Sequence, residues 1–231
     1  MLLKSLDQLR NLFAQHENPF LAHKMKNYMR NKFEFFGIQS PLRKELTHKF
    51  IKENGFPNED QVVDTITTLW DMKERELQNA ALQIMDMRKR KFHPDDILLI
   101  EQITIVKPWW DTVDHIASNH AGHYFSLYPE QLAIADRWIH SDNIWLQRNA
   151  ILYQLKYKHH TDAERLFYYI NNVLESNEFF IQKAIGWSLR QYSKYNPEVV
   201  IGYVESTRLS NLSKREALKV LNRKVSANSD G

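Results

Sequence analysis

The sequence predicts an all-α fold, a right-handed α-solenoid of about six repeats. Apolar residues recur at helical spacing, as at Val62, Ile66, Leu69 and Trp70, whereas few segments alternate apolar and polar residues. Similar short segments return at intervals of about 35 residues. Signals for the start of a helix return at the same interval, which makes each repeat a helix, a turn and a second helix.

The recurring segment marks the second helix of each repeat. Leu77–Leu82 (LQNAAL) resembles Leu146–Ile151 (LQRNAI), which in turn resembles Ile181–Ile185 (IQKAI). Steps of about 35 residues place further members near residues 41–46, 113 and 213–218. Because a helix pair cannot bury its apolar face alone, the pairs are expected to stack as HEAT-like repeats do. A helical bundle with coincidental spacing is the alternative.

A start signal marks the first helix of each repeat. A proline or a capping side chain precedes acidic residues of the first helical turn. The signals are Pro57–Asp60, Pro94–Asp96, Pro129–Glu130, Thr161–Asp162 and Pro197–Glu198. This spacing predicts one repeat domain over residues 1–225, followed by a polar tail at 226–231.

Composition excludes several classes of function. The 231 residues include no cysteine, which excludes a disulfide framework and a thiol nucleophile and is compatible with the cytoplasm. There is no glycine-rich phosphate loop, no apolar run long enough to span a bilayer and no signal peptide. The spacing of His115, His120 and His123 does not place all three on one α-helical face, so no metal site is predicted. The net charge of +3 is compatible with an anionic partner.

A polar row runs through equivalent positions of successive second helices. Steps of about 35 residues connect Lys44, Asn79, Asp114, Arg148 and Lys183. Because every member is polar, the row is expected to face solvent or a ligand. Its three cations, which Lys156 and Arg190 could extend, would match a phosphodiester backbone along a concave surface. The alternative is an ion pair between Asp114 and Arg148 that joins neighbouring repeats.

Two tryptophans stand beside the carboxylate of this row. In the stretch KPWWDTVDHI at 107–116, Trp110 and Asp114 lie four residues apart and therefore share one face of a helix. Trp109 lies about 100° further round the helix and is expected in the core. Asp111 is expected to cap or orient the start of this helix.

A third aromatic residue, Trp187, can border the same surface because it lies one turn beyond Lys183. Two indoles and a carboxylate form a cage for a cation, and each indole attracts positive charge by roughly 1–2 kcal/mol when water is excluded. Alkylation at N3 or N7 makes a purine cationic, and departure of the base leaves a positive oxocarbenium sugar. A fixed carboxylate would stabilise that developing charge and could orient the attacking water.

Three longer segments carry a family likeness. They are KPWWDTVD at 107–114, SDNIWLQRNAILYQLKYK at 141–158 and FFIQKAIGWSLR at 179–190. Together they resemble the AlkD family of bacterial alkylpurine DNA glycosylases, and the likeness extends from 27–33 to 212–217. The resemblance implies a HEAT-like solenoid that excises 3-methyladenine and 7-methylguanine type lesions without flipping the base. It also implies a catalytic Asp114, lesion-facing Trp110 and Trp187, a phosphate-gripping Arg148, and Tyr28 at the border of the site.

The first hypothesis is therefore a DNA glycosylase. It is expected to be monofunctional because no lysine stands out as a Schiff-base nucleophile. Arg148, Lys183 and Lys44 are expected to grip phosphates. The expected partner is double-stranded DNA carrying alkylated purines, bound by a cytoplasmic monomer that uses no cofactor. A non-catalytic solenoid that binds bent or branched DNA and a protein-binding scaffold are the rivals. Only the two DNA hypotheses predict an affinity that falls steeply with salt.

Overall fold

The computed structural model describes residues 2–229, with side chains described for residues 5–222. Within residues 2–229 the regular structure is helical, apart from an isolated bridge between Glu34 and Glu74. The predicted all-α fold is therefore confirmed. The handedness, the number of repeats and the concave face stay predictions. None of the described helices has the length and hydropathy of a membrane span.

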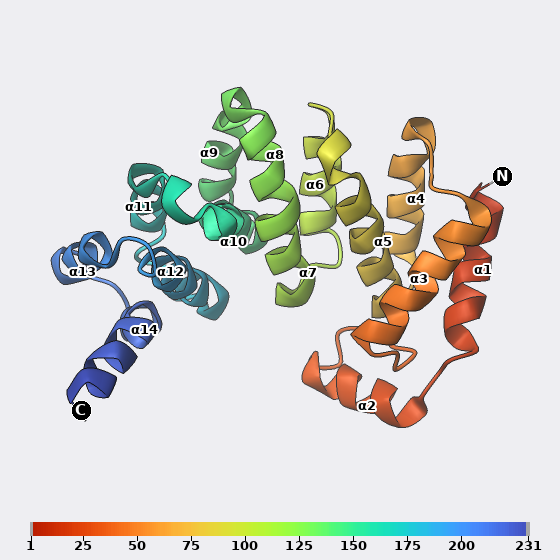
Figure 1. Cartoon of the computed structure of the whole chain (residues 1–231), viewed down its shortest axis with the longest axis horizontal. Coiled ribbons are helices and arrows are strands. Elements are labelled where there is room, and N and C mark those ends of the chain that lie inside the picture. Colours follow the sequence, from red (N-terminus) through yellow and green to blue (C-terminus); the bar gives the residue numbers. More distant parts are fainter. Residues whose placement is uncertain (1, 230–231) are drawn as a thin grey trace. The chain divides into compact units, whose positions relative to one another are not determined.

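The chain divides between Phe92 and His93 into two compact units. The first unit consists of α1 (Leu2–Ala14), α2 (Pro19–Tyr28), α3 (Ser40–Asn54), α4 (Glu59–Asp71) and α5 (Arg75–Arg88) (Figure 1). α1 packs against α3 and α4, and α5 packs against the same two helices. Their core contains Phe13, Ile66, Trp70 and Leu77, each almost completely buried.

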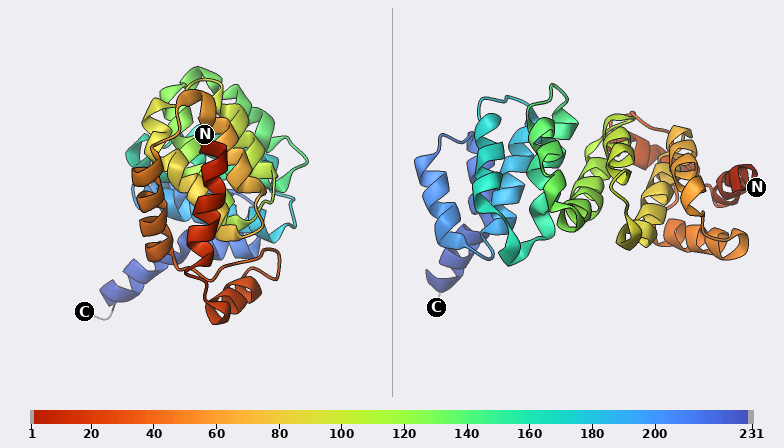
Figure 2. Two further views of the ribbon diagram at one scale, coloured as in Figure 1. Left: turned by 90° about the vertical axis from the view of Figure 1, so that its right-hand side faces the viewer. Right: turned by 90° about the horizontal axis from the view of Figure 1, so that it is seen from above.

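The second unit contains the predicted site. It consists of α6 (Asp96–Ile105), α7 (Trp110–His115), α8 (Gly122–Leu127), α9 (Ala133–Ile139), α10 (Ile144–Leu152), α11 (Ala163–Asn172), α12 (Phe179–Tyr192), α13 (Pro197–Ser206) and α14 (Asn211–Ser229). Helix α10 packs against α7 and α12, and α12 packs against α14, so that the second helices of successive repeats contact one another (Figure 2). The single domain predicted over 1–225 stays a prediction. Of the predicted tail, 226–229 belong to α14, and 230–231 lie outside the described residues.

Two of the five predicted helix starts carry the predicted capping hydrogen bonds, at Asn58 and Asp162. Asn58 accepts a hydrogen bond from the backbone of Gln61, whose side chain accepts one in return, which forms a capping box before α4. Asp162 accepts from the backbone N–H of Arg165 before α11. Helix α13 begins on Pro197 itself, whereas Pro129 opens a short 3-10 turn that precedes α9.

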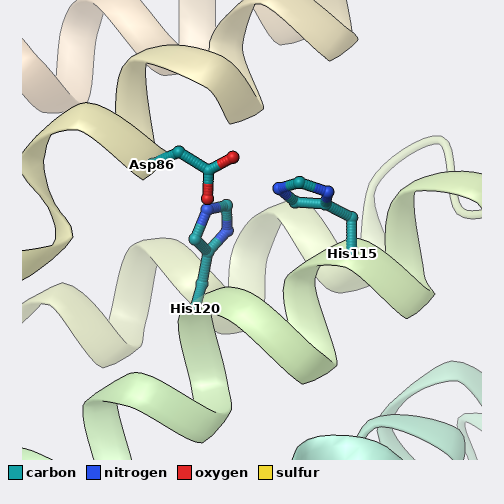
Figure 3. Close-up of side chains that lie close together, drawn as sticks. All are labelled: Asp86, His115 and His120. Atoms are coloured by element: carbon teal, nitrogen blue, oxygen red, sulfur yellow. The ribbon is translucent and has the colours of Figure 1, made fainter. Parts of the chain in front are cut away.

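Helices α7 and α8 are joined by a π-helical segment, Ile116–Ala121. A π-turn closes hydrogen bonds between residues five apart and so brings His115 and His120 to one side. Their ring centroids lie 5.2 Å apart, and Figure 3 shows both rings on the same side of the helix. The prediction concerned all three histidines on one α-helical face and is not contradicted, but it assumed α-helical spacing and therefore did not anticipate the contact between His115 and His120. The absence of a metal stays a prediction.

Candidate active site

The centre of the polar row is an ion pair between Asp114 of α7 and Arg148 of α10. Arg148 Nε donates to Oδ1 of Asp114 at 2.7 Å, and Nη2 donates to Oδ2 at 2.9 Å. Nη1 of Arg148 donates to the backbone carbonyl of Phe180 in α12. A single guanidinium thus connects the second helices of three successive repeats and holds both oxygens of the carboxylate in place.

The exposure of the two partners differs. The side chain of Arg148 is 5% exposed and that of Asp114 is 17% exposed, so the accessible part of the pair is mainly its anionic end. The row is predicted to face solvent or a ligand, and the 5% exposure excludes solvent for Arg148 and leaves a ligand untested. A buried guanidinium needs acceptors, and Asp114 and the Phe180 carbonyl supply them. The ion pair of the alternative interpretation is present, and the phosphate contact of Arg148 stays a prediction.

The environment of Asp114 changes its acidity. Burial raises the pKa of the Asp114 carboxyl above its ordinary value of 3.8, and the nearby charge of Asp111 adds to the rise. The hydrogen bonds and the positive charge of Arg148 act in the opposite direction without cancelling the effect of burial. Asp114 is consequently a better proton acceptor than an ordinary aspartate.

An aromatic cluster adjoins the ion pair. The ring centroid of Trp109 lies 5.7 Å from that of Trp145 and 5.0 Å from that of Phe180. The guanidinium carbon of Arg148 lies 5.9 Å from the centroid of the Phe180 ring. Trp109 is buried, which confirms its predicted core position. Asp111 lies in the first turn of α7, where its charge complements the helix N-terminus, whereas the N-cap position is occupied by Trp109 and not by Asp111.

The two predicted lesion-facing indoles are both partly exposed. Trp110 is the first residue of α7, one turn before Asp114, so both occupy one face of this helix. Trp187 lies on α12, one turn after Lys183 and one turn before Arg190. Side chains at these three positions of α12 share one helical face, which places a half-buried indole between two cations.

Both of these cations bind one carboxylate that the sequence analysis did not identify. Lys183 Nζ lies 3.0 Å from Oε1 of Glu216, and Arg190 Nη1 lies 2.6 Å from Oε2. The hydrogen bond from Lys183 is the largest cause that lowers the pKa of Glu216 below its ordinary value of 4.5. Glu216 reaches α12 because α14 approaches closely at Gly186, where an added Cβ would lie 2.5 Å from Cβ of Glu216.

The remaining predicted DNA-binding residues are exposed. Lys156 lies beyond α10 and donates a hydrogen bond to the side chain of Asn119 in the π-helical segment. Tyr28, at the end of α2, is 69% exposed, and Lys44 is exposed on α3. Tyr28 and Lys44 belong to the first unit, whereas the other predicted site residues belong to the second.

Fold and site together define a helical repeat protein that presents a carboxylate fixed by an arginine at the junction of three repeats. Residues 9–221 match the family described as DNA alkylation repair enzyme. The chain belongs to this family, which confirms the resemblance noted from the sequence.

Solved structures similar to this chain include the following two. A structure described as a predicted DNA alkylation repair enzyme from Enterococcus faecalis has 34% sequence identity and a TM-score of 0.83, covering 88% of this chain and 95% of that chain. AlkD2 from Streptococcus mutans has 15% identity and a TM-score of 0.61, covering 84% of this chain and 98% of that chain, and supports the fold alone. No curated protein sequence matches this chain.

Proposed function

We propose that this protein is a monofunctional DNA glycosylase that hydrolyses the N-glycosidic bond of cationic N3- and N7-alkylpurines in duplex DNA without flipping the base. The observation that carries the proposal is the partly exposed carboxylate of Asp114, fixed through both oxygens by a buried Arg148. Because the carboxylate is already in place, it needs no reorganisation when positive charge develops beside it. Membership of the DNA alkylation repair enzyme family supports a role in repair.

In this mechanism the bond between C1′ and the base nitrogen breaks first. The electron pair leaves with the base, which becomes neutral, and the positive charge passes to the sugar as an oxocarbenium ion. Asp114 stabilises this charge more in the transition state than in the ground state. Water then adds to C1′, and Asp114 orients the water and accepts its proton, a role that its raised pKa favours.

The neighbouring residues bind and position the DNA. Trp110 and Trp187 hold the damaged nucleotide by CH–π and cation–π contacts. Arg148 fixes the carboxylate, and its phosphate contact, like those of the other predicted DNA-binding residues, belongs to the proposal. The proposed enzyme acts as a cytoplasmic monomer without a cofactor.

Single-turnover release of 7-methylguanine and 3-methyladenine from duplex DNA tests the proposal. Asp114→Asn keeps the shape of the side chain and removes its charge. We expect a rate loss of about 100-fold or more, equivalent to about 2.7 kcal/mol of barrier, with DNA affinity unchanged or improved.

A second aspartate–arginine pair in the same unit supplies a matched control. Oδ1 of Asp136 in α9 lies 2.6 Å from Nη1 of Arg165 in α11, so this ion pair joins the two helices. Asp136→Asn should leave the single-turnover rate nearly unchanged. Equal losses in the two variants, or a wild type that releases neither base, would contradict the glycosylase proposal.

A non-catalytic DNA-binding protein is the second candidate. It is favoured by the bidentate ion pair, because Arg148 offsets the charge of Asp114 and the pair joins repeats as a structural contact would. This candidate predicts salt-dependent binding of bent or branched DNA and no release of either base from any duplex.

A further inference from the structure

Two neighbouring helices of the second unit share a single carboxylate. The sequence of α12 contains the cations Lys183 and Arg190 and no carboxylate. The sequence of α14 contains five cations and one carboxylate, Glu216. The two helices pack against each other (Figure 1), and Glu216 is buried, whereas Lys214 and Arg215 beside it are exposed. The one acidic side chain of α14 is therefore directed to α12.

The close approach of the two helices places Glu216 within reach of both cations of α12. Gly186 lies under α14, where an added Cβ would be 2.9 Å from the carbonyl oxygen of Ser213 and 2.5 Å from Cβ of Glu216. Ser213 is buried, and its hydroxyl donates a hydrogen bond to the backbone carbonyl of Gln182 at 2.9 Å. Because Ser213 and Glu216 are three residues apart on one helix, the contact that fixes the serine also directs the glutamate to α12.

The carboxylate holds the two cations that border Trp187. Glu216 binds Lys183, one turn before the indole, through Oε1 at 3.0 Å and Arg190, one turn after it, through Oε2 at 2.6 Å. The side chain of Glu216 is 11% exposed, whereas those of the two cations are 35% and 24% exposed. At these contacts each cation uses one of its several donors, so both keep donors for phosphates.

The charge around Trp187 affects the nucleotide that this indole is proposed to face. That nucleotide carries a positive charge, first on the base and then on the sugar, and two unopposed cations beside the indole would repel it. Glu216 reduces the formal charge of this group from +2 to +1, and the hydrogen bond from Lys183, which lowers the pKa of Glu216, keeps the carboxylate ionised. The pair of Asp114 and Arg148 is formally neutral, so Glu216 sets the charge balance on the α12 side of the site.

We propose that Glu216 is a specificity-determining residue, through which the protein prefers a positively charged nucleotide to a neutral one of the same shape. It acts through Lys183 and Arg190, by holding them and offsetting their charge, and is therefore a positioning residue and not a catalytic one. The inference rests on the proposed function for its cationic substrate, but it is measured in binding and does not require release of a base. In a purely structural role, loss of the carboxylate would weaken the binding of both nucleotides alike.

The affinities for two abasic-site analogues in one duplex sequence test this role. A pyrrolidine nucleotide carries a protonated ring nitrogen, whereas a tetrahydrofuran nucleotide has nearly the same shape and is neutral. The ratio of the two dissociation constants measures the preference for positive charge, and a loss of folded protein affects both constants equally and cancels. The wild type should bind the pyrrolidine duplex more tightly. In Glu216→Gln this preference should fall about fourfold, the effect of one unit charge at about 10 Å with an effective dielectric constant of about 40.

Two further variants separate charge from structure. Glu216→Asp keeps the negative charge on a shorter side chain and should keep most of the wild-type preference. Asp136→Asn makes the same change in net charge as Glu216→Gln by opening the ion pair with Arg165, and it should keep the whole preference. If Glu216→Asp or Asp136→Asn loses as much of the preference as Glu216→Gln does, the inference is wrong.

The outcome is separable from that of the glycosylase proposal. A wild type that releases bases, with the full preference retained in Glu216→Gln, would overturn the role of Glu216 and leave the enzyme proposal intact. A wild type that releases no base but prefers the pyrrolidine duplex, with the preference reduced in Glu216→Gln, would refute the enzyme and retain the role of Glu216. A wild type that binds both duplexes equally would overturn the inference.

Discussion

Replacement of Arg148 by methionine should destabilise the second unit by about 3 kcal/mol at neutral pH. The change keeps an unbranched side chain but leaves Asp114 and the Phe180 carbonyl without their donors. Removal of one partner from a buried ion pair costs about 3–5 kcal/mol. The 17% exposure of Asp114 allows some hydration of the remaining carboxylate, which places the expected loss at the lower end. For a domain of this size, about 3 kcal/mol lowers the melting midpoint by about 6–12 °C.

The loss should also depend on pH. Without Arg148 the pKa of Asp114 rises further, so protonation removes the unpaired charge as the pH falls. The destabilisation should therefore be smaller at acidic than at neutral pH. Urea unfolding at both pH values, followed by tryptophan fluorescence, measures this loss in the free energy of unfolding.

A double-mutant cycle shows whether the ion pair is the cause. Arg148→Met/Asp114→Asn leaves no buried charge at the pair and should be less destabilised than Arg148→Met alone. A loss below about 1 kcal/mol in Arg148→Met would refute the reasoning. So would a double variant whose loss equals the sum of the losses in the two single variants.

Three other predictions concern the same unit. In a pH series of single-turnover rates, base release should decline in acid with a midpoint above 3.8, because burial raises the pKa of Asp114 and only its charged form stabilises the oxocarbenium ion. The variant Asp114→Asn should lack this decline. Gly186→Ala should lower the free energy of unfolding in urea by about 1–3 kcal/mol, since the added Cβ would lie 2.5 Å from Cβ of Glu216. Gly202→Ala should raise it by about 0.5–1 kcal/mol, because no atom lies within 4 Å of the added Cβ. Glu216→Gln should be less stable than the wild type near neutral pH. Because the pKa of Glu216 is lowered, its stabilisation is present above 4.5 and is lost as the pH falls through the folded-state pKa, so the two urea midpoints should converge in acid.

Features that depend on neighbouring residues could be predicted from the sequence. The capping box at Asn58 and the cap at Asp162 are local, and both helices begin where these residues predict. The buried position of Trp109 beside a partly exposed Trp110 was also predicted, although Trp109 is the extended residue before α7 and the rotation of about 100° within a helix is not the reason. The repeat period could be predicted for the same reason, because it is the regular recurrence of such local signals along the chain.

Contacts between repeats could not be predicted in the same way. Arginine is mostly exposed in proteins, and a polar row containing Arg148 is expected to face solvent or a ligand rather than to be buried between helices. Its burial becomes understandable only when Asp114 and the Phe180 carbonyl are seen around the guanidinium. Glu216 had one signal, its place in the recurring segment of the last repeat, but this spacing does not say which side chains it meets.

The π-helical segment gives the two ends of one helix different rotational phases. Before the segment, the phase directs Asp114 to Arg148, and after it Tyr124 and Phe125 enter the core. An α-helix turns by about 100° per residue, so deletion of one residue between 116 and 121 would rotate one end against the other by that angle. Either the carboxylate or the core aromatics would then lose their place. The length of this segment is therefore under constraint irrespective of the side chains that it carries.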